Sequence, residues 1–230
     1  MSNRFIKVLP TDRLIAEFSV WSADLMRIGD DLARIEPYAD ILHVDVADGR
    51  FAPAFLFFPD LVAGIRKLSS RPIHVHLMVA DDVVLSQIEQ FADAGADLIS
   101  IHVENESVAD VALDLLGKCD VATGMVLRVE TPVERIGKYV SRLDFVTLLG
   151  TAIGVKGQGL DERAADRLQQ AGRIIAECGA DHRIVLAADG GIRDNTVPLL
   201  RQAGAKTVVM GSLAFGAPSL EERMRWLHAL

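Results

Sequence analysis

Cysteine is scarce in this chain of 230 residues, which contains only Cys119 and Cys178. We expect two ordinary thiols in a reducing compartment rather than a disulfide framework. Long apolar runs are also missing, since none approaches the roughly 20 residues that a membrane-spanning helix needs. The first residues carry Arg4, Lys7 and Arg13 without the long apolar stretch of a signal peptide. The sequence therefore predicts a cytoplasmic protein with no membrane association.

A concentration of positive charge is missing too. The net charge is −8 at neutral pH, and lysine and arginine are scattered among acidic residues. No nucleic-acid partner is expected, because nucleic acids are bound by clustered positive charge. An anionic ligand must instead be held locally, by backbone N–H groups or a single basic side chain. Half of the residues are hydrophobic, so a chain of this length can build one large core.

Short apolar runs alternate with helical patterns along the chain. Eight runs, most of them continuously apolar as in strands buried on both faces, predict strands at residues 15–20, 41–46, 73–78, 98–103, 122–129, 145–149, 184–188 and 207–210. Helical patterns cover residues 24–38, 81–94, 107–118, 132–140, 161–178 and 194–203, with a turn at 213–215. Repeated βα units indicate an α/β fold. We expect one domain, residues 1–230, forming a single (β/α)8 TIM barrel with residues 1–13 as an N-terminal extension.

Histidine and aspartate stand at the carboxyl ends of predicted strands. His43 and Asp45 end the second strand, His76 lies on the third and Asp189 follows the seventh. Side chains alternate faces along a strand, so His43 and Asp45 point the same way. Barrels of this kind carry their active sites at this end. Two imidazoles and two carboxylates suit Zn²⁺, Mn²⁺ or Fe²⁺, with Co²⁺ also possible, and are too rich in nitrogen for a usual Mg²⁺ or Ca²⁺ site.

This ligand set suits proton transfer at a carbon beside a carbonyl group. A metal ion bound to a ketose would stabilise an enediolate. Asp45 and Asp189 could then remove a proton from one face of the carbon and return one to the other face, which inverts it. His102, at the end of the fourth strand, and Glu104, two residues on, are expected to support these residues rather than to bind the metal. The residues thus predict an epimerase.

Glycine-rich loops follow the sixth, seventh and eighth predicted strands. Glycine allows backbone N–H groups to turn toward an anion, and a lysine in the first loop adds positive charge. Barrels often bind phosphate between their last loops and a helix N-terminus. We expect these loops to hold a phosphate group through Gly154, Val155, Lys156, Gly157, Gly190, Gly191, Gly211 and Ser212.

In combination and order, several segments resemble the ribulose-phosphate 3-epimerase family from about residue 15 onward. These segments are FSVWSAD (18–24), HVDVADGRFAP (43–53), HVHLMV (74–79), AGAD (94–97), GVKGQ (154–158), DGGI (189–192) and GS (211–212). The resemblance implies a barrel that inverts C3 of a ketose phosphate, D-ribulose 5-phosphate or D-xylulose 5-phosphate or a related sugar, with one divalent metal ion. It also implies a homo-oligomer.

The resemblance assigns roles to single residues as well. His43, Asp45, His76 and Asp189 would be the metal ligands, and Asp45 and Asp189 would also be the acid/base pair. Ser19 and His76 would lie near the substrate, and Met78 would lie over the reacting centre.

Some positions depart from the family's usual pattern. Methionine is usual where Ala47 and Leu149 stand, and an aspartate is common at His74. The loop Pro-Gly-Phe-Gly-Gly of the family is replaced from Ile153 onward, with Lys156 as a new charge. Methionine provides adaptable, polarizable surface, so its loss alters the wall of the site. We expect the chemistry to be kept and leave another ketose phosphate open as substrate, such as a hexulose 6-phosphate.

Two other interpretations stay open on the sequence alone. The first is a lyase or decarboxylase on the same barrel, but those enzymes use an Asp-x-Lys-x-x-Asp pattern, and the stretch from Asp45 to Arg50 has no lysine. The second is a non-catalytic sugar-phosphate-binding protein, which predicts the loss of an acid/base carboxylate. Asp45 and Asp189 are both present, which favours the epimerase.

Overall fold

The computed structural model describes residues 4–180 and 184–230. Its strands are β1 (Ile15–Ser19), β2 (Ile41–Asp48), β3 (Phe55–Leu56), β4 (Ile73–Met78), β5 (Leu98–His102), β6 (Ala122–Leu127), β7 (Phe145–Leu149), β8 (Val185–Asp189) and β9 (Thr207–Met210). Its α-helices are α1 (Arg4–Val8), α2 (Ile28–Ile35), α3 (Pro59–Leu68), α4 (Asp81–Asp93), α5 (Ala109–Lys118), α6 (Ala164–Glu177), α7 (Val197–Gln202), α8 (Ser212–Phe215) and α9 (Leu220–His228). Short 3-10 helices are η1 (Val20–Ser22), η2 (Val133–Lys138) and η3 (Val140–Arg142).

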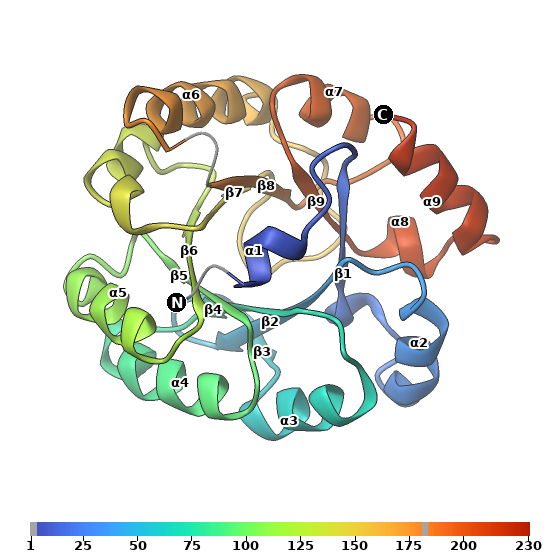
Figure 1. The fold of residues 1–230 in the computed structure, drawn as a ribbon, viewed down its shortest axis with the longest axis horizontal. Coiled ribbons are helices and arrows are strands. Elements are labelled where there is room, and N and C mark those ends of the chain that lie inside the picture. The colour runs from blue at the N-terminus through green and yellow to red at the C-terminus, as the bar shows by residue number, and fades with distance from the viewer. Residues whose placement is uncertain (1–3, 181–183) are drawn as a thin grey trace.

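Parallel strands close into a barrel that helices surround (Figure 1). Strand β1 pairs with β2 on one side and with β9 on the other. The pairing continues from β2 through β4, β5, β6, β7 and β8 to β9, while β3 pairs antiparallel with the end of β2. The predicted (β/α)8 TIM barrel, with its eight strands, is therefore confirmed.

The two faces of the strands bury different kinds of residue. On the outer face, Val44 and Val75 belong to the large apolar core that also contains Leu32 of α2 and Ile88 of α4. On the inner face, polar side chains follow the alternation of the strands. The register sets His43 beside both Ser19 and His74, and sets Asp45 beside His76. The barrel interior is therefore polar toward its carboxyl end.

A separate apolar cluster closes the amino-terminal end of the barrel. Ile6 of α1 packs against this cluster, which includes Leu9 and Ile41. In Figure 1, α1 lies across the centre of the ring of strands. The segment 1–13, predicted as an extension, thus contributes Ile6 and Leu9 to the apolar cluster at this end of the barrel. Residues 1–3 lie outside the described part.

Two of the expected helices differ from the structure. The pattern at residues 132–140 forms the 3-10 helices η2 and η3 rather than an α-helix. Gly137 lies within this segment, and glycine disfavours a regular helix. The pattern at residues 24–38 yields only the eight residues of α2.

Three α-helices, α1, α3 and α9, were not predicted. Of these, α3 and α9 each carry a starting signal. Pro59 stands in the first turn of α3, where its missing N–H costs no hydrogen bond. Ser219 caps α9 by accepting a hydrogen bond from the backbone N–H of Glu222 at 3.2 Å. This serine followed by glutamate three residues later is the pattern of a capping box.

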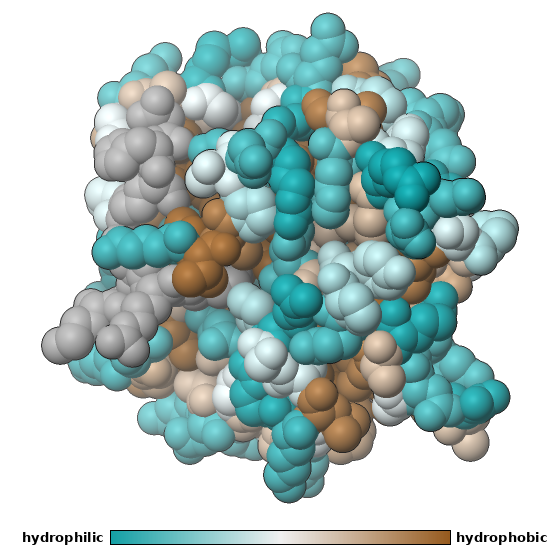
Figure 2. Space-filling view, turned by 45° about the vertical axis from the view of Figure 1, so that its right-hand side comes forward, coloured by the Kyte–Doolittle hydropathy of each residue, from teal (hydrophilic) through white to brown (hydrophobic). Residues whose placement is uncertain are grey.

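Within the described residues, no helix is both long and apolar enough to cross a membrane. Figure 2 shows one face of the molecule, where hydrophilic side chains predominate and hydrophobic ones are scattered among them. Most of the large apolar side chains gather instead between the strands and the helices.

Candidate active site

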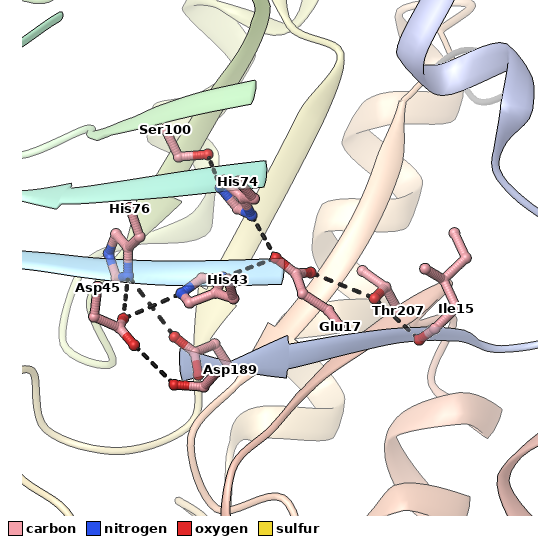
Figure 3. Close-up of polar contacts among 10 residues, drawn as sticks. Ile15, Glu17, His43, Asp45, His74, His76, Ser100, Asp189 and Thr207 are labelled. Carbon is pink, nitrogen blue, oxygen red and sulfur yellow. Dashed lines mark hydrogen bonds and ion pairs between the residues drawn. The ribbon is translucent and has the colours of Figure 1, made fainter. Parts of the chain in front are cut away.

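The carboxyl ends of β2, β4 and β8 bring together the four residues predicted as metal ligands (Figure 3). His43 Nε2 and His76 Nδ1 lie 3.1 and 3.2 Å from Asp45 Oδ1. His76 Nδ1 also lies 3.9 Å from Asp189 Oδ2. One donor atom from each of the four residues lies within 4.8 Å of the other three. The four residues that the sequence predicts as metal ligands therefore lie together in the structure.

This cluster fits a divalent transition-metal ion. It offers two imidazole nitrogens and two carboxylates, a donor set that zinc, manganese, iron and cobalt accept. The side chains are shielded from solvent, with His43 fully buried and Asp189 the most exposed at 18%. The expectation of a metal ion is supported by this convergence of donors.

The two carboxylates of the cluster differ in pKa. Burial by itself raises the pKa of Asp45, but the imidazoles of His43 and His76 outweigh burial and hold this pKa well below its usual range. Ser19 adds a hydrogen bond, donating its hydroxyl to Asp45 Oδ2 at 2.9 Å. Burial raises the pKa of Asp189 to about 6, with Asp45 adding to the rise and the imidazoles opposing it. At neutral pH Asp45 is firmly ionised, whereas Asp189 is close to its titration range.

A deeper polar layer lies inside the barrel and was missed by sequence reasoning. Glu17 Oε1 lies 2.7 Å from His43 Nδ1 and 2.5 Å from His74 Nδ1. Burial alone raises the pKa of Glu17, but the two imidazoles lower it to about 2. Burial lowers the pKa of His74 to about 4, so its ring is neutral. The available signal was an acidic residue in an otherwise apolar strand, two positions before Ser19.

His102 contacts the metal cluster from the other side. Its Nε2 lies 2.8 Å from His76 Nε2, and the two rings stack with their centroids 5.0 Å apart. Its Nδ1 lies 2.9 Å from Glu104 Oε2. Burial lowers the pKa of His102 to about 4, so the ring is neutral and donates its Nδ1–H to the carboxylate. The expected supporting role of His102 and Glu104 matches these contacts.

A cavity of about 330 Å³ opens beside the cluster. This volume lies within the range of small-molecule sites. Asp45, His76 and Asp189 line it, whereas His43 is buried beneath the surface. The lining also includes all residues predicted to contact the substrate, namely Ser19, Met78, Gly154, Val155, Lys156, Gly157, Gly190, Gly191, Gly211 and Ser212.

Further cavity residues were not predicted. Trp21, Ser22, Thr151, Gln158 and Arg193 line the same cavity. Each lies within a few residues of a predicted site residue, so proximity along the chain was the available signal.

Two glycines show why the loop after β8 needs this residue type. Gly190 and Gly191 have φ angles of +88° and +69°, which other residues rarely adopt. A Cβ on Gly190 would lie 2.3 Å from Thr151 Oγ1, and one on Gly191 would lie 2.7 Å from Leu160 Cα. The loop after β8 therefore packs its backbone directly against the loop after β7, at the rim of the cavity.

Lys156 is held at the mouth of the cavity by Trp21. Its ammonium donates to the carbonyl oxygen of Trp21 at 2.5 Å and lies 4.6 Å from the centre of the indole ring. Burial lowers the pKa of Lys156, and Asp45 opposes this change. A lysine tethered in this way keeps positive charge beside the glycine loops.

The departures from the family pattern leave the cavity wall apolar. Ala47 packs with Met78 in one small cluster, and Leu149 packs with Val126 in another. Ile153 packs against both clusters. Ala47, Leu149 and Ile153 thus all pack among apolar neighbours.

Comparison with known proteins places this arrangement in a family. The model of the family described as "Ribulose-phosphate 3 epimerase family" matches residues 15–215. Ribulose-phosphate 3-epimerase 1 of Cupriavidus necator is 35% identical, with 96% of this chain and 88% of the relative covered. The ribulose-phosphate 3-epimerase of Aquifex aeolicus is 34% identical, with 92% of this chain and 94% of the relative covered. The chain belongs to the ribulose-phosphate 3-epimerase family. It is an isomerase of the epimerase type, as the sequence predicted.

Solved structures agree on the fold. A 3-hexulose-6-phosphate synthase from Salmonella typhimurium has a TM-score of 0.68 at 14% identity, with 94% of this chain and 97% of that one covered. An orotidine 5'-phosphate decarboxylase from Pyrococcus horikoshii has a TM-score of 0.66 at 14% identity, covering 93% and 97%. At such low identity the likeness extends to the barrel alone.

Proposed function

We propose that this protein is a metal-dependent epimerase that inverts C3 of a ketose phosphate, either D-ribulose 5-phosphate and D-xylulose 5-phosphate or a related pair. The observation that carries the proposal is the pair Asp45 and Asp189, which line one cavity from strands separated by β1 and β9. The names of the relatives supply the substrate class. The presence of both carboxylates in the cavity disfavours a protein that only binds sugar phosphates.

Asp45 and Asp189 are the proton-transfer pair. A divalent ion held by the four ligands would supply positive charge that stabilises an enediolate form of the substrate. Asp45 removes a proton from one face of C3. Asp189 delivers a proton to the opposite face, and the two roles exchange in the reverse direction.

Other cavity residues position the sugar. Met78 and Leu149 give the reacting region an apolar lining that limits water. The loops around Gly154, Gly190 and Gly211 hold the phosphate group, with Lys156 as the nearby positive charge. We also propose that the protein is a cytoplasmic homo-oligomer and that residues 1–230 form a single domain.

The test is conversion of D-ribulose 5-phosphate to D-xylulose 5-phosphate by the protein loaded in turn with Zn²⁺, Mn²⁺, Fe²⁺ and Co²⁺, followed by NMR. Rapid conversion with at least one metal, abolished by a chelator, is expected. If bound metal is confirmed and no pentulose phosphate reacts, the same assay with hexulose 6-phosphates tests the related substrates. Lack of C3 inversion with every ketose phosphate would overturn the proposal.

A further inference from the structure

Glu17 is a fully buried carboxylate in the centre of the barrel that the proposed reaction does not use. Figure 3 shows it between the imidazoles of His43 and His74. Its Oε1 lies 2.7 and 2.5 Å from the Nδ1 atoms of these two rings, and its Oε2 lies 3.5 Å from Thr207 Oγ1. A buried charge is retained only when it is paired and hydrogen-bonded, and Glu17 meets this condition.

The contacts of Glu17 determine which ring nitrogen of His43 can bind a metal ion. An ionised carboxylate only accepts hydrogen bonds, so the Nδ1 of His43 carries a proton. The other nitrogen, Nε2, faces Asp45 at 3.1 Å and belongs to the cluster of possible ligands. A carboxylate behind an imidazole ligand fixes its tautomer and its orientation.

His74 and Ser100 in turn hold Glu17. His74 donates its Nδ1–H to the same oxygen of Glu17, and its Nε2 lies 2.7 Å from Ser100 Oγ, whose hydroxyl donates. The rings of His43 and His74 meet edge to face with their centroids 4.8 Å apart. These contacts fix the position of the Glu17 carboxylate. Through its hydrogen bond to Nδ1, the carboxylate in turn fixes the orientation of the His43 ring.

We propose that Glu17 is a positioning residue for the metal centre, holding His43 so that Nε2 is presented to the ion, with His74 and Ser100 fixing Glu17. This inference rests on the proposed metal-dependent function. Glu17, His43 and His74 also lie close enough together to be considered as a second metal site. Their contacts of 2.5 and 2.7 Å are those of hydrogen bonds, so we expect a single ion per chain.

The test is the affinity for Zn²⁺ and Co²⁺ in Glu17→Gln, measured by competition with a coloured chelator. Glutamine has the same shape but donates as well as accepts, so we expect affinity about 10- to 100-fold weaker and altered Co²⁺ absorption bands. Glu17→Asp, which keeps the charge, should recover part of the affinity. Thr147→Val is the matched control, because Thr147 is buried in β7 and its hydroxyl has no hydrogen-bond partner among the described residues.

A second measurement needs no variant. In the zinc-loaded protein with ¹⁵N-labelled histidine, NMR should show His43 with a proton on Nδ1 and the metal on Nε2. The reverse assignment, two ions per chain, or unchanged affinity in Glu17→Gln would overturn the positioning role. If the wild type binds zinc in the expected way but inverts no ketose phosphate, the proposed function fails while the positioning role stands.

Discussion

Asp45 and Asp189 belong to one site, but the walls that carry them are built differently. On the β2 wall, Asp45 has His43, His76 and Ser19 within 3.2 Å. On the β8 wall, the nearest ion-pair partner of Asp189 among the described residues is His76, at 3.9 Å. Burial raises the pKa of both carboxylates, but only Asp45 has enough partners to reverse the effect. Contacts, rather than depth, thus decide which of the two carboxylates has the lower pKa.

The largest effect is expected when the β8 wall loses its acid. Asp189→Asn removes the proton donor and one metal ligand, so turnover should fall by about 10³-fold or more. Thermal unfolding should stay cooperative, because the site lies above the apolar core. Activity is measured by NMR, with Asp194→Asn as the control, since Asp194 is an exposed residue paired with Arg223. Retained activity in Asp189→Asn would refute the assignment.

The same variant tests the difference in pKa through stability. In the metal-free protein, the raised pKa of Asp189, about 6, lies above the value of about 4 for an unfolded chain. Ionisation of Asp189 therefore costs stability, and the cost grows as pH rises from about 4 to 6. Relative to Asp189→Asn, the wild type should lose about 3 kcal/mol over this range. Urea unfolding at several pH values measures this loss. If the difference in the free energy of unfolding between the two proteins does not change with pH, the pKa of Asp189 is not raised, and the two walls do not differ in this respect.

Removing one contact from the β2 wall should have a smaller effect. Ser19→Ala deletes the hydroxyl that donates to Asp45 at 2.9 Å. Hydrogen bonds to charged groups contribute about 1.5–3 kcal/mol, so we expect kcat to fall by about 10- to 100-fold. Steady-state kinetics would show this loss with little change in KM. An unchanged kcat would mean that the imidazoles alone keep Asp45 ionised.

Lys156 belongs to neither the β2 wall nor the β8 wall, so it should affect only the binding of the sugar phosphate. Lys156→Ala removes the charge beside the glycine loops, and KM for the sugar phosphate should rise by about tenfold with kcat unchanged. Lys156→Arg keeps the charge and serves as the matched control. A fall in kcat at constant KM would instead connect Lys156 with Asp45, whose charge raises the pKa of Lys156 against the effect of burial.

The smallest effect is expected for Leu149→Met, on the β8 wall. Leu149 pairs with Asp189 in the register of β7 and β8, and methionine has a similar volume. Such exchanges usually change stability by less than about 1.5 kcal/mol. We expect kcat within about threefold of the wild type, measured alongside Ser19→Ala. A loss as large as that of Ser19→Ala would show that apolar packing also controls Asp189.

The sequence was sufficient to predict which residues share one face of a strand, because side chains alternate between the two faces. His43 and Asp45 could be placed on one face because they stand two positions apart, and the strands were recognised from continuous apolar runs. Gly190 and Gly191 could be recognised because they follow a predicted strand, where glycine lets backbone N–H groups turn toward an anion. The convergence of β2, β4 and β8 followed once the fold was a barrel.

The parts that could not be predicted depend on contacts between strands distant in sequence. Nothing local indicates that Glu17 faces His43, because the contact exists only once β1 lies beside β2. The difference between Asp45 and Asp189 likewise depends on which side chains lie within 4 Å. The helix expected at residues 132–140 failed because apolar spacing alone does not distinguish an α-helix from 3-10 turns.

The most direct test of a two-carboxylate epimerase is the origin of the hydrogen at C3. The metal-loaded wild type is given D-ribulose 5-phosphate in D₂O, and the first-formed product is examined by NMR. With Asp45 and Asp189 acting on opposite faces, we predict that this product carries deuterium at C3 while the remaining substrate keeps its hydrogen. A first-formed D-xylulose 5-phosphate that retains the substrate's own hydrogen would mean that one group carries the proton across, and would contradict the pair.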